Sequence, residues 1–295
     1  FAGRRDTQLR AVWSPLTIAQ LGGGSFTRYD VRIARAVDDS MVATTVLNQQ
    51  SDNSYLFTGL ENGTSYRITV VAITTANASA LEGNTAVVTE IPARQPDPVT
   101  GTYVPTSGTT GTVSWPPPVS DGGSPVLQYR VRLSTAGATV VDDTFGPGVF
   151  SSVVSGLTRG VGYSVTMTVT NAVGSSDDTH SMTQPNVPSA PVITAVAAAT
   201  VDDSAGFQVT WTTPANNGAP ITGYEVTATQ ILGRSGAIAP RVAATYTCTS
   251  PTTSCIIFAP GTARSYSYVV QADNLAGAGQ ASAPFVVPDP PGPTP

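Results

Sequence analysis

The chain has 295 residues, a length that predicts two or three domains. Apolar residues make up 40% of the chain, enough to fill hydrophobic cores, whereas only 11% are charged, against roughly 25% in an ordinary soluble domain. All 14 basic residues are arginine and the net charge is −5, so nucleic acid and an anionic membrane surface are excluded as expected partners, because both require a basic face.

A repeat of about 100 residues runs through the chain. Trp13, Trp115 and Trp211 lie 102 and 96 residues apart, and each precedes a Tyr-x-Val sequence. A second tyrosine follows in every copy, at Tyr66, Tyr163 and Tyr266. A repeat of this length is a whole domain rather than one blade or turn of a solenoid.

Apolar residues alternate with polar ones in three segments of every copy, which is typical of strands with one buried face. In chain order these segments are 9–13, 29–33 and 66–72, then 111–115, 129–133 and 163–169, then 207–211, 224–228 and 266–272. Turn sequences rich in Gly, Asn and Asp separate the first two segments of each copy, at 22–24, 121–123 and 216–218. The pattern predicts an all-β chain of three antiparallel β-sandwiches.

Further motifs make the chain resemble the fibronectin type III family over essentially its whole length. A proline follows each tryptophan, and Gly-Leu precedes the second tyrosine at 59–60 and 156–157. The sequences Asn171-Ala-Val-Gly174 and Asn274-Leu-Ala-Gly277 are similar to the family's turn between strands F and G. The resemblance implies three tandem immunoglobulin-like sandwiches, with the tryptophans and second tyrosines in their cores and the tyrosine hydroxyl bonded to upstream backbone. A true immunoglobulin domain fits less well, because no cysteine pair is expected to bridge the sheets.

The expected domains span residues 1–92, 97–185 and 189–288, followed by a Pro-rich linker at 289–295. Only 12 residues precede Trp13, so strand A of the first domain is expected to be short or missing, and we expect the chain to be an excerpt from a longer array. In the third domain Ala259-Pro260 replaces Gly-Leu, so its corner is expected to differ. Pro-rich joints at 92–98 and 185–191 favour an extended conformation and predict a semi-rigid rod on the order of 100 Å long.

The two cysteines, Cys248 and Cys255, flank a predicted turn in the third domain. A redox pair or a metal site is one interpretation, but a metal site needs more soft ligands, and the chain's one histidine, His180, lies in another domain. We therefore expect a disulfide that staples the turn, which in turn indicates an oxidising compartment.

No catalytic residue, cofactor or metal site is predicted. His180 has no expected nucleophile or orienting partner, and is interpreted as an exposed or half-buried strand residue. Four Asp-Asp pairs could bind Ca²⁺, but they occupy different places in different domains and are interpreted as solvated turns. These pairs are 38–39, 142–143, 177–178 and 202–203.

Two N-glycosylation sequons begin at Asn62 and Asn77 and would be acceptors in a eukaryotic source, while in a bacterium both are simply turns.

The function predicted from the features of the sequence is a non-catalytic structural or adhesive module of an extracellular or cell-surface protein. Its expected partners are other protein chains or copies of itself, and glycans. The alternative is a spacer in a secreted bacterial enzyme that degrades polysaccharides. No apolar run approaches the roughly 20 residues that span a bilayer, so no membrane insertion is expected within this segment.

Overall fold

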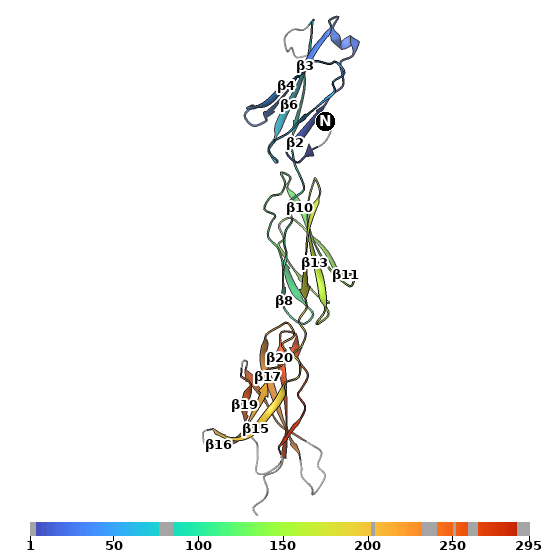
Figure 1. Cartoon of the computed structure of the whole chain (residues 1–295). Helices are drawn as coiled ribbons and strands as arrows, with labels where there is room; N and C mark the ends of the chain where they lie inside the picture. The colour runs from blue at the N-terminus through green and yellow to red at the C-terminus, as the bar shows by residue number, and fades with distance from the viewer. Residues whose placement is uncertain are drawn as a thin grey trace, which may run out of the picture.

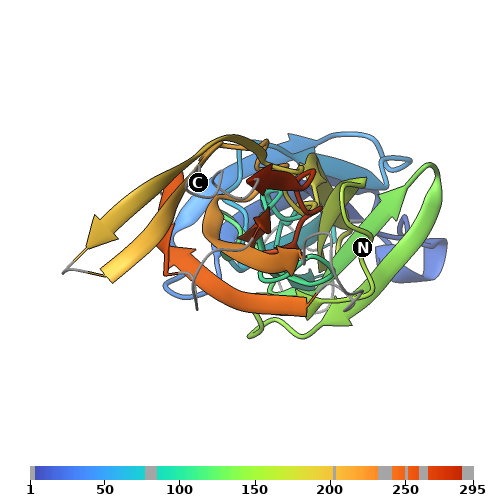
Figure 2. The same cartoon turned by 90° about the horizontal axis from the view of Figure 1, so that it is seen from below.

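The computed structural model describes residues 4–76, 85–201, 204–231, 241–249, 252–258 and 265–287. Three β-sandwiches follow one another along the axis of a rod (Figure 1), and they overlap when the molecule is viewed along that axis (Figure 2). We call them unit 1 (β1–β7), unit 2 (β8–β14) and unit 3 (β15–β22). The predicted all-β fold of three tandem sandwiches is confirmed.

Each unit packs one three-stranded sheet against a larger sheet, and every strand pairing is antiparallel. In unit 1 the sheet orders are β1-β2-β5 and β4-β3-β6-β7. Its elements are β1 (Arg4–Arg5), β2 (Gln8–Val12), the 3-10 helix η1 (Ile18–Leu21), β3 (Phe26–Arg35), β4 (Met41–Leu47), β5 (Ser54–Phe57), β6 (Tyr66–Thr74) and β7 (Thr85–Glu90).

Unit 2 repeats this plan with sheet orders β12-β9-β8 and β11-β10-β13-β14. Its strands are β8 (Thr102–Pro105), β9 (Gly111–Ser114), β10 (Val126–Thr135), β11 (Ala138–Phe145), β12 (Ser151–Val154), β13 (Gly162–Asn171) and β14 (Ser175–Thr183).

Unit 3 has sheet orders β15-β16-β19 and β18-β17-β20-β21, with β22 also paired to β20. Its strands are β15 (Val192–Val201), β16 (Ser204–Thr212), β17 (Ile221–Ile231), β18 (Arg241–Thr249), β19 (Ser254–Ile257), β20 (Ser265–Asn274), β21 (Gly277–Ala278) and β22 (Phe285–Val287).

The alternating pattern of the sequence becomes the inner and outer faces of these sheets. Along β13, the side chains from Tyr163 to Val169 at odd positions are buried, while those at even positions lie partly in solvent. In each core the repeated tryptophan packs against the tyrosine of the following Tyr-x-Val sequence. The ring centroids are 5.4 Å apart for Trp13–Tyr29, 5.9 Å for Trp115–Tyr129 and 5.1 Å for Trp211–Tyr224.

Trp13 differs from its two counterparts, because it is only partly buried whereas Trp115 and Trp211 are fully buried. In units 2 and 3, Val99 and Ile193 are buried at the start of the unit and belong to its core. In unit 1 the first described strand is β1, whose two residues pair with Gln8 and Leu9. Trp13 therefore packs against the core of unit 1 from its margin, whereas its two counterparts lie inside their cores.

An open cleft of about 230 Å³ lies beside Trp13 in unit 1, between the segment that follows β2 on one side and β6 and β7 on the other. A second hollow of about 90 Å³ continues along Ala11, Val70 and Val88. The larger cleft has a mixed polar and apolar lining, and the smaller hollow is lined by apolar residues.

The second tyrosine of each repeat fixes the connection that precedes it. The Tyr66 hydroxyl accepts a hydrogen bond from the Glu61 backbone N–H at 3.0 Å, and the Tyr163 hydroxyl accepts one from the Thr158 N–H at 2.8 Å. Both tyrosines are buried, and so is Tyr266. The expected local difference at Ala259-Pro260 lies outside the described residues.

A disulfide joins Cys248 to Cys255, with 6.2 Å between their Cα atoms. Cys248 lies on β18 and Cys255 on β19, so the bond crosses from one sheet to the other. The expectation that no cysteine pair bridges the sheets is therefore wrong for unit 3. Because the two strands are consecutive, the same bond also closes the short connection between them.

We expect the double variant Cys248→Ser with Cys255→Ser to lower the free energy of unfolding of unit 3 by about 2–3 kcal/mol, because a short loop is no longer closed in the unfolded chain. Differential scanning calorimetry of the whole chain measures this as an earlier transition for one unit, with the transitions of the other two unchanged. Wild-type protein with reductant should reproduce the shift. An unchanged thermogram would show that the disulfide does not stabilise unit 3.

Candidate functional site at the interdomain joints

The joint between units 1 and 2 is held by backbone hydrogen bonds from both units to the linker. The Gly63 N–H, in the turn before β6, donates to the Pro92 carbonyl at 3.0 Å. Two residues further along, the Arg94 N–H donates to the Gly122 carbonyl of unit 2 at 2.9 Å. The linker is therefore bonded first to the unit that it leaves and then to the unit that it enters.

The joint between units 2 and 3 repeats this arrangement at equivalent positions. The Gly160 N–H donates to the Gln184 carbonyl at 3.0 Å, and the Asn186 N–H donates to the Asn217 carbonyl at 2.9 Å. The accepting carbonyl and the donating amide are again two residues apart. Two joints with different linker sequences thus share one backbone hydrogen-bond pattern.

A buried asparagine completes the first joint. Asn171, the last residue of β13, donates through Nδ2 to the carbonyls of Arg94 and Asp121, both at 2.7 Å, with Ser124 O at 3.4 Å. Its Oδ1 accepts two backbone N–H groups of the following turn. The side chain is 3% exposed, so a single carboxamide joins the linker and two turns of unit 2 away from water.

Asn274 does the same at the second joint, where it is the last residue of β20. Its Nδ2 donates to the carbonyls of Asn186 at 2.9 Å and Asn216 at 2.8 Å, with Ala219 O at 3.4 Å. Its Oδ1 accepts the Ala276 N–H at 2.8 Å. Sequence reasoning assigned both asparagines to turns and missed this role. The available signal was their position, eight residues after the second tyrosine in both units.

Unit 1 carries Thr74 at that position, eight residues after Tyr66. A threonine hydroxyl has one hydrogen to donate, whereas a carboxamide has two. The contact that Asn171 and Asn274 make with several carbonyls therefore cannot be reproduced there. The two joints described here are the places where this clamp is formed.

Close backbone contact at the first joint also requires glycine. A Cβ atom on Gly123 would lie 2.2 Å from the Gly63 nitrogen, and one on Gly122 would lie 2.3 Å from the Arg94 carbonyl oxygen. Gly122 and Gly123 also have φ angles of +78° and +82°. The turn between β9 and β10 therefore needs glycine for its conformation and for its contact with unit 1.

Charged groups support the same joint from outside. The Arg94 guanidinium pairs with Asp97 at 2.7 Å, and this hydrogen bond raises the pKa of Arg94. The Asp97 N–H donates in turn to the Ser120 carbonyl at 2.9 Å. The Arg94 side chain is thus joined to Asp97, whose backbone is bonded to unit 2. A partly exposed ion pair of this kind contributes little to stability.

At the second joint, the fully buried Gln184 fixes the start of the linker. Its Nε2 donates to the Ser107 carbonyl at 2.8 Å, and its Oε1 accepts the Tyr103 hydroxyl. Burial raises the pKa of Tyr103. This side chain ties the end of β14 to the opposite sheet, so the linker leaves unit 2 from a fixed point.

The predicted acceptor Asn62 lies in the turn at the first joint. Its Nδ2 donates to Asp6 at 2.7 Å, and its Oδ1 accepts the Thr7 N–H at 2.9 Å. A Cβ on Gly123 would approach the Asn62 carbonyl carbon to 2.7 Å, so this turn touches unit 2. These contacts give Asn62 a structural role independent of any glycan. The second sequon residue, Asn77, lies outside the described residues.

The acidic pairs are not all in turns, so that interpretation is wrong for two of them. Asp38-Asp39 lies in a turn, but Asp142-Asp143 lies within β11 and Asp177-Asp178 within β14. Asp202-Asp203 is outside the described residues. In the part of the chain that the structure describes, no three His, Cys, Asp or Glu side chains gather closely enough to hold a metal ion.

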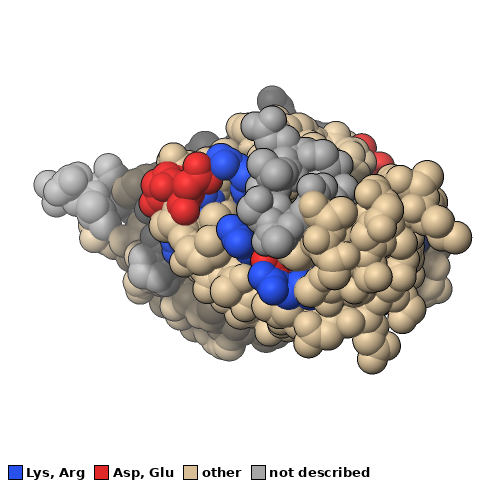
Figure 3. All heavy atoms as spheres, turned by 90° about the horizontal axis from the view of Figure 1, so that it is seen from above, with Lys and Arg blue, Asp and Glu red and all other residues tan. Residues whose placement is uncertain are grey.

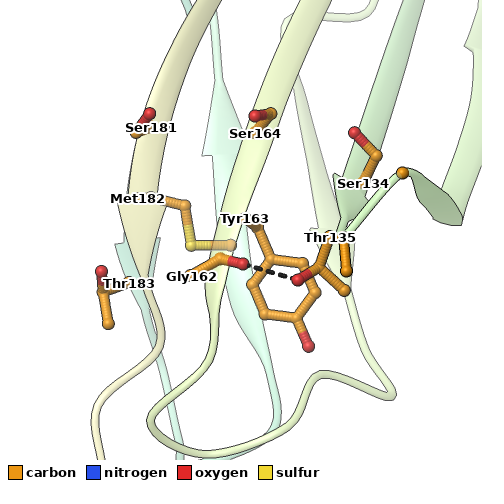
Figure 4. A pocket seen from close by; sticks show the side chains of 10 residues that line it. Ser134, Thr135, Gly162, Tyr163, Ser164, Ser181, Met182 and Thr183 are labelled. Atoms are coloured by element: carbon orange, nitrogen blue, oxygen red, sulfur yellow. Dashed lines mark hydrogen bonds between the residues drawn. The ribbon is translucent and has the colours of Figure 1, made fainter.

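His180 lies within β14 and is half-buried. Both of its ring nitrogens are buried without a hydrogen-bond partner among the described residues. An open cavity of about 250 Å³ at the end of unit 2 is lined by Ser, Thr, Gly, Ala, Met and Tyr163 and does not include His180 (Figure 4). Its one drawn hydrogen bond runs from Thr135 Oγ1 to the Gly162 carbonyl at 2.8 Å. Its lining is uncharged, and the Tyr163 hydroxyl already accepts the Thr158 N–H.

Among the described residues, no helix combines the length and the apolar character needed to span a bilayer. The sheet topology, the tyrosine corners and the joints define a tandem array of immunoglobulin-like sandwiches. The family model for the fibronectin type III domain matches three stretches, residues 1–87, 95–184 and 189–287. The chain therefore belongs to the fibronectin type III family.

Among solved structures, the chain is similar to one described as the crystal structure of chicken CNTN1 FN1-FN3 domains. The sequences are 16% identical, the match covers 97% of this chain and 95% of that chain, and the TM-score is 0.36.

We expect Asn171→Ala to loosen the first joint, because it removes the side chain that donates to the linker carbonyl and to the turn between β9 and β10 and accepts from the turn after β13. Leaving those carbonyls without a partner should also cost about 1–3 kcal/mol in the stability of unit 2. Residual dipolar couplings measure the joint directly: units 1 and 2 should share one alignment tensor in the wild type and have different tensors in the variant. The exposed Asn53, which is remote from both joints in sequence, provides the control Asn53→Ala. A common tensor in both variants would contradict the role of Asn171.

Proposed function

We propose that this chain is a non-catalytic structural or adhesive module of an extracellular fibre, appendage or cell-surface protein. It acts as a semi-rigid spacer that also offers surfaces for assembly with other chains. The observation that carries the proposal is the repeated joint, in which a buried asparagine and two backbone hydrogen bonds fix each linker. A chain selected to hold a distance needs fixed joints, whereas flexible tethering does not.

The disulfide between Cys248 and Cys255 supports the extracellular location in this proposal, because disulfides persist in oxidising compartments. The low charge of the chain supports an assembly role. Among the described residues visible at the end that carries unit 1, most are neither acidic nor basic, and the charges lie in a few small groups (Figure 3). Low charge leaves little repulsion between neighbouring chains.

Small-angle X-ray scattering of the whole chain tests the spacer role. We expect a maximum dimension on the order of 100 Å with the cross-section of a single sandwich. The double variant Asn171→Ala with Asn274→Ala should give a broader distribution of distances at unchanged secondary structure. A compact particle, or a wild type as variable as the double variant, would overturn the proposal.

A further inference from the structure

The strand β4 forms one edge of the larger sheet in unit 1. It pairs with β3, and no strand among the described residues pairs with its other side. Its sequence, Met-Val-Ala-Thr-Thr-Val-Leu, contains no charge, no proline and no glycine. Met41, Val42 and Val46 expose 58%, 44% and 51% of their surfaces. An uncharged, β-branched edge strand of this kind is a template for pairing with another strand.

Unit 2 carries acidic residues at the same place. In register against the central strand, Thr44 of β4 lies opposite Arg32, and Asp142 of β11 lies opposite the equivalent Arg132. The neighbouring Thr45 corresponds in the same way to Asp143. A hydrogen bond from Arg130 lowers the pKa of Asp142, so this carboxylate is ionised at neutral pH. Two carboxylates at the centre of β11 oppose strand pairing there.

Unit 3 carries a disulfide at this place. Leu47 of β4 lies opposite Tyr29, and the residue that lies opposite the equivalent Tyr224 is Cys248. Its disulfide ties the end of β18 to β19 in the other sheet. Of the three equivalent edge strands, β4 is thus the one with neither a central carboxylate nor a disulfide.

We propose that β4 is a self-association site, at which two copies of the chain pair antiparallel through this strand. With Thr44 of both copies at the two-fold axis, Val42 lies opposite Val46 of the second copy, and Val46 lies opposite its Val42. Val42 and Val46 are both exposed, and the register with β3 shifts at Val42, which lies opposite no residue of β3. The symmetric order of residues around Thr44 favours a second copy of the same strand as the occupant. The two four-stranded sheets become one continuous sheet.

The shape of the molecule allows this pairing. In Figure 1, β4 lies on one flank of unit 1, along the side of the rod. Antiparallel strands place the two rods in opposite directions, so units 2 and 3 of each copy extend away from the interface. A two-fold contact of this kind uses the same surface on both copies and closes on itself.

The interface is small. One strand pair buries less than the roughly 800 Å² per partner of a standard stable interface, so we expect a weak dimer. Such a contact becomes populated where chains are concentrated, as in a fibre. Self-association through β4 is a property separate from the proposed spacer role, and each has its own test. Scattering at low concentration measures the stiffness of the rod. The dependence of sedimentation on concentration measures self-association.

Sedimentation velocity of the whole chain, from about 10 μM to about 1 mM, tests the site. The wild type should sediment faster as its concentration rises. The variant Thr44→Asp with Thr45→Asp gives β4 the acidic pair that β11 already carries and should stay at the monomer value throughout. The control Ser181→Asp with Thr183→Asp makes the same change in charge at two exposed positions of β14 and should associate as the wild type does.

Circular dichroism and thermal unfolding check that the acidic variant is folded. Should it unfold, Val42→Lys with Val46→Lys replaces it, since like charges then face each other across the two-fold axis. The reciprocal variant Asp142→Thr with Asp143→Thr should associate more strongly than the wild type, because unit 2 then also has an uncharged edge. A wild type whose sedimentation does not depend on concentration, or a folded β4 variant that associates normally, would overturn the proposal. Equal loss of association in the β14 control would do the same.

Discussion

The buried carboxamide of Asn171, repeated in Asn274, is the interaction on which the arrangement of the units depends. Carbonyl groups of a linker that lies between two sandwiches lose contact with water and need donors from the protein. One asparagine supplies them to the linker and to the turn between β9 and β10, while its oxygen accepts N–H groups of the turn that follows β13. The same group therefore satisfies the linker and positions the unit that follows it. Because the bonds go to backbone, the two linkers can differ in sequence and still be held in the same way.

The close contact at the first joint depends on the hydrogen bonds of Asn171. Gly122 and Gly123 can approach Gly63 and the Arg94 carbonyl because they carry no side chain, but glycine alone does not hold a conformation. The hydrogen bonds from Asn171 restrict the turn and offset the entropy that its glycines would lose. Flexible residues and a rigid clamp thus work together: the glycines permit the contact and the asparagine makes it specific.

The fold could be predicted from the sequence because its main determinants are local and repeated. Alternation along 163–169 fixes which residues enter the core, and the Trp and Tyr spacings fix the repeat. The joint could not be predicted, because Asn171 and Arg94 are 77 residues apart and Asn274 and Asn186 are 88 apart. The sheet-bridging position of Cys255 also depends on which sheet each strand enters. Likewise, Asp142 lies in a strand because an outward position at a sheet edge accepts a charged residue as readily as a turn does.

Because the chain carries few charges, the position of each charge matters for which surfaces can contact another molecule. With only 11% of its residues charged, the chain has weak repulsion between whole molecules, and control of contact falls to individual edge residues. Asp142 and Asp143 occupy the centre of one edge strand, whereas the equivalent Thr44 and Thr45 leave another edge uncharged. Units that share one core and one kind of joint can therefore differ in what their edges contact. In an array of this kind, the cores and joints set the length of the rod, and the residues at the strand edges determine where one rod can meet another.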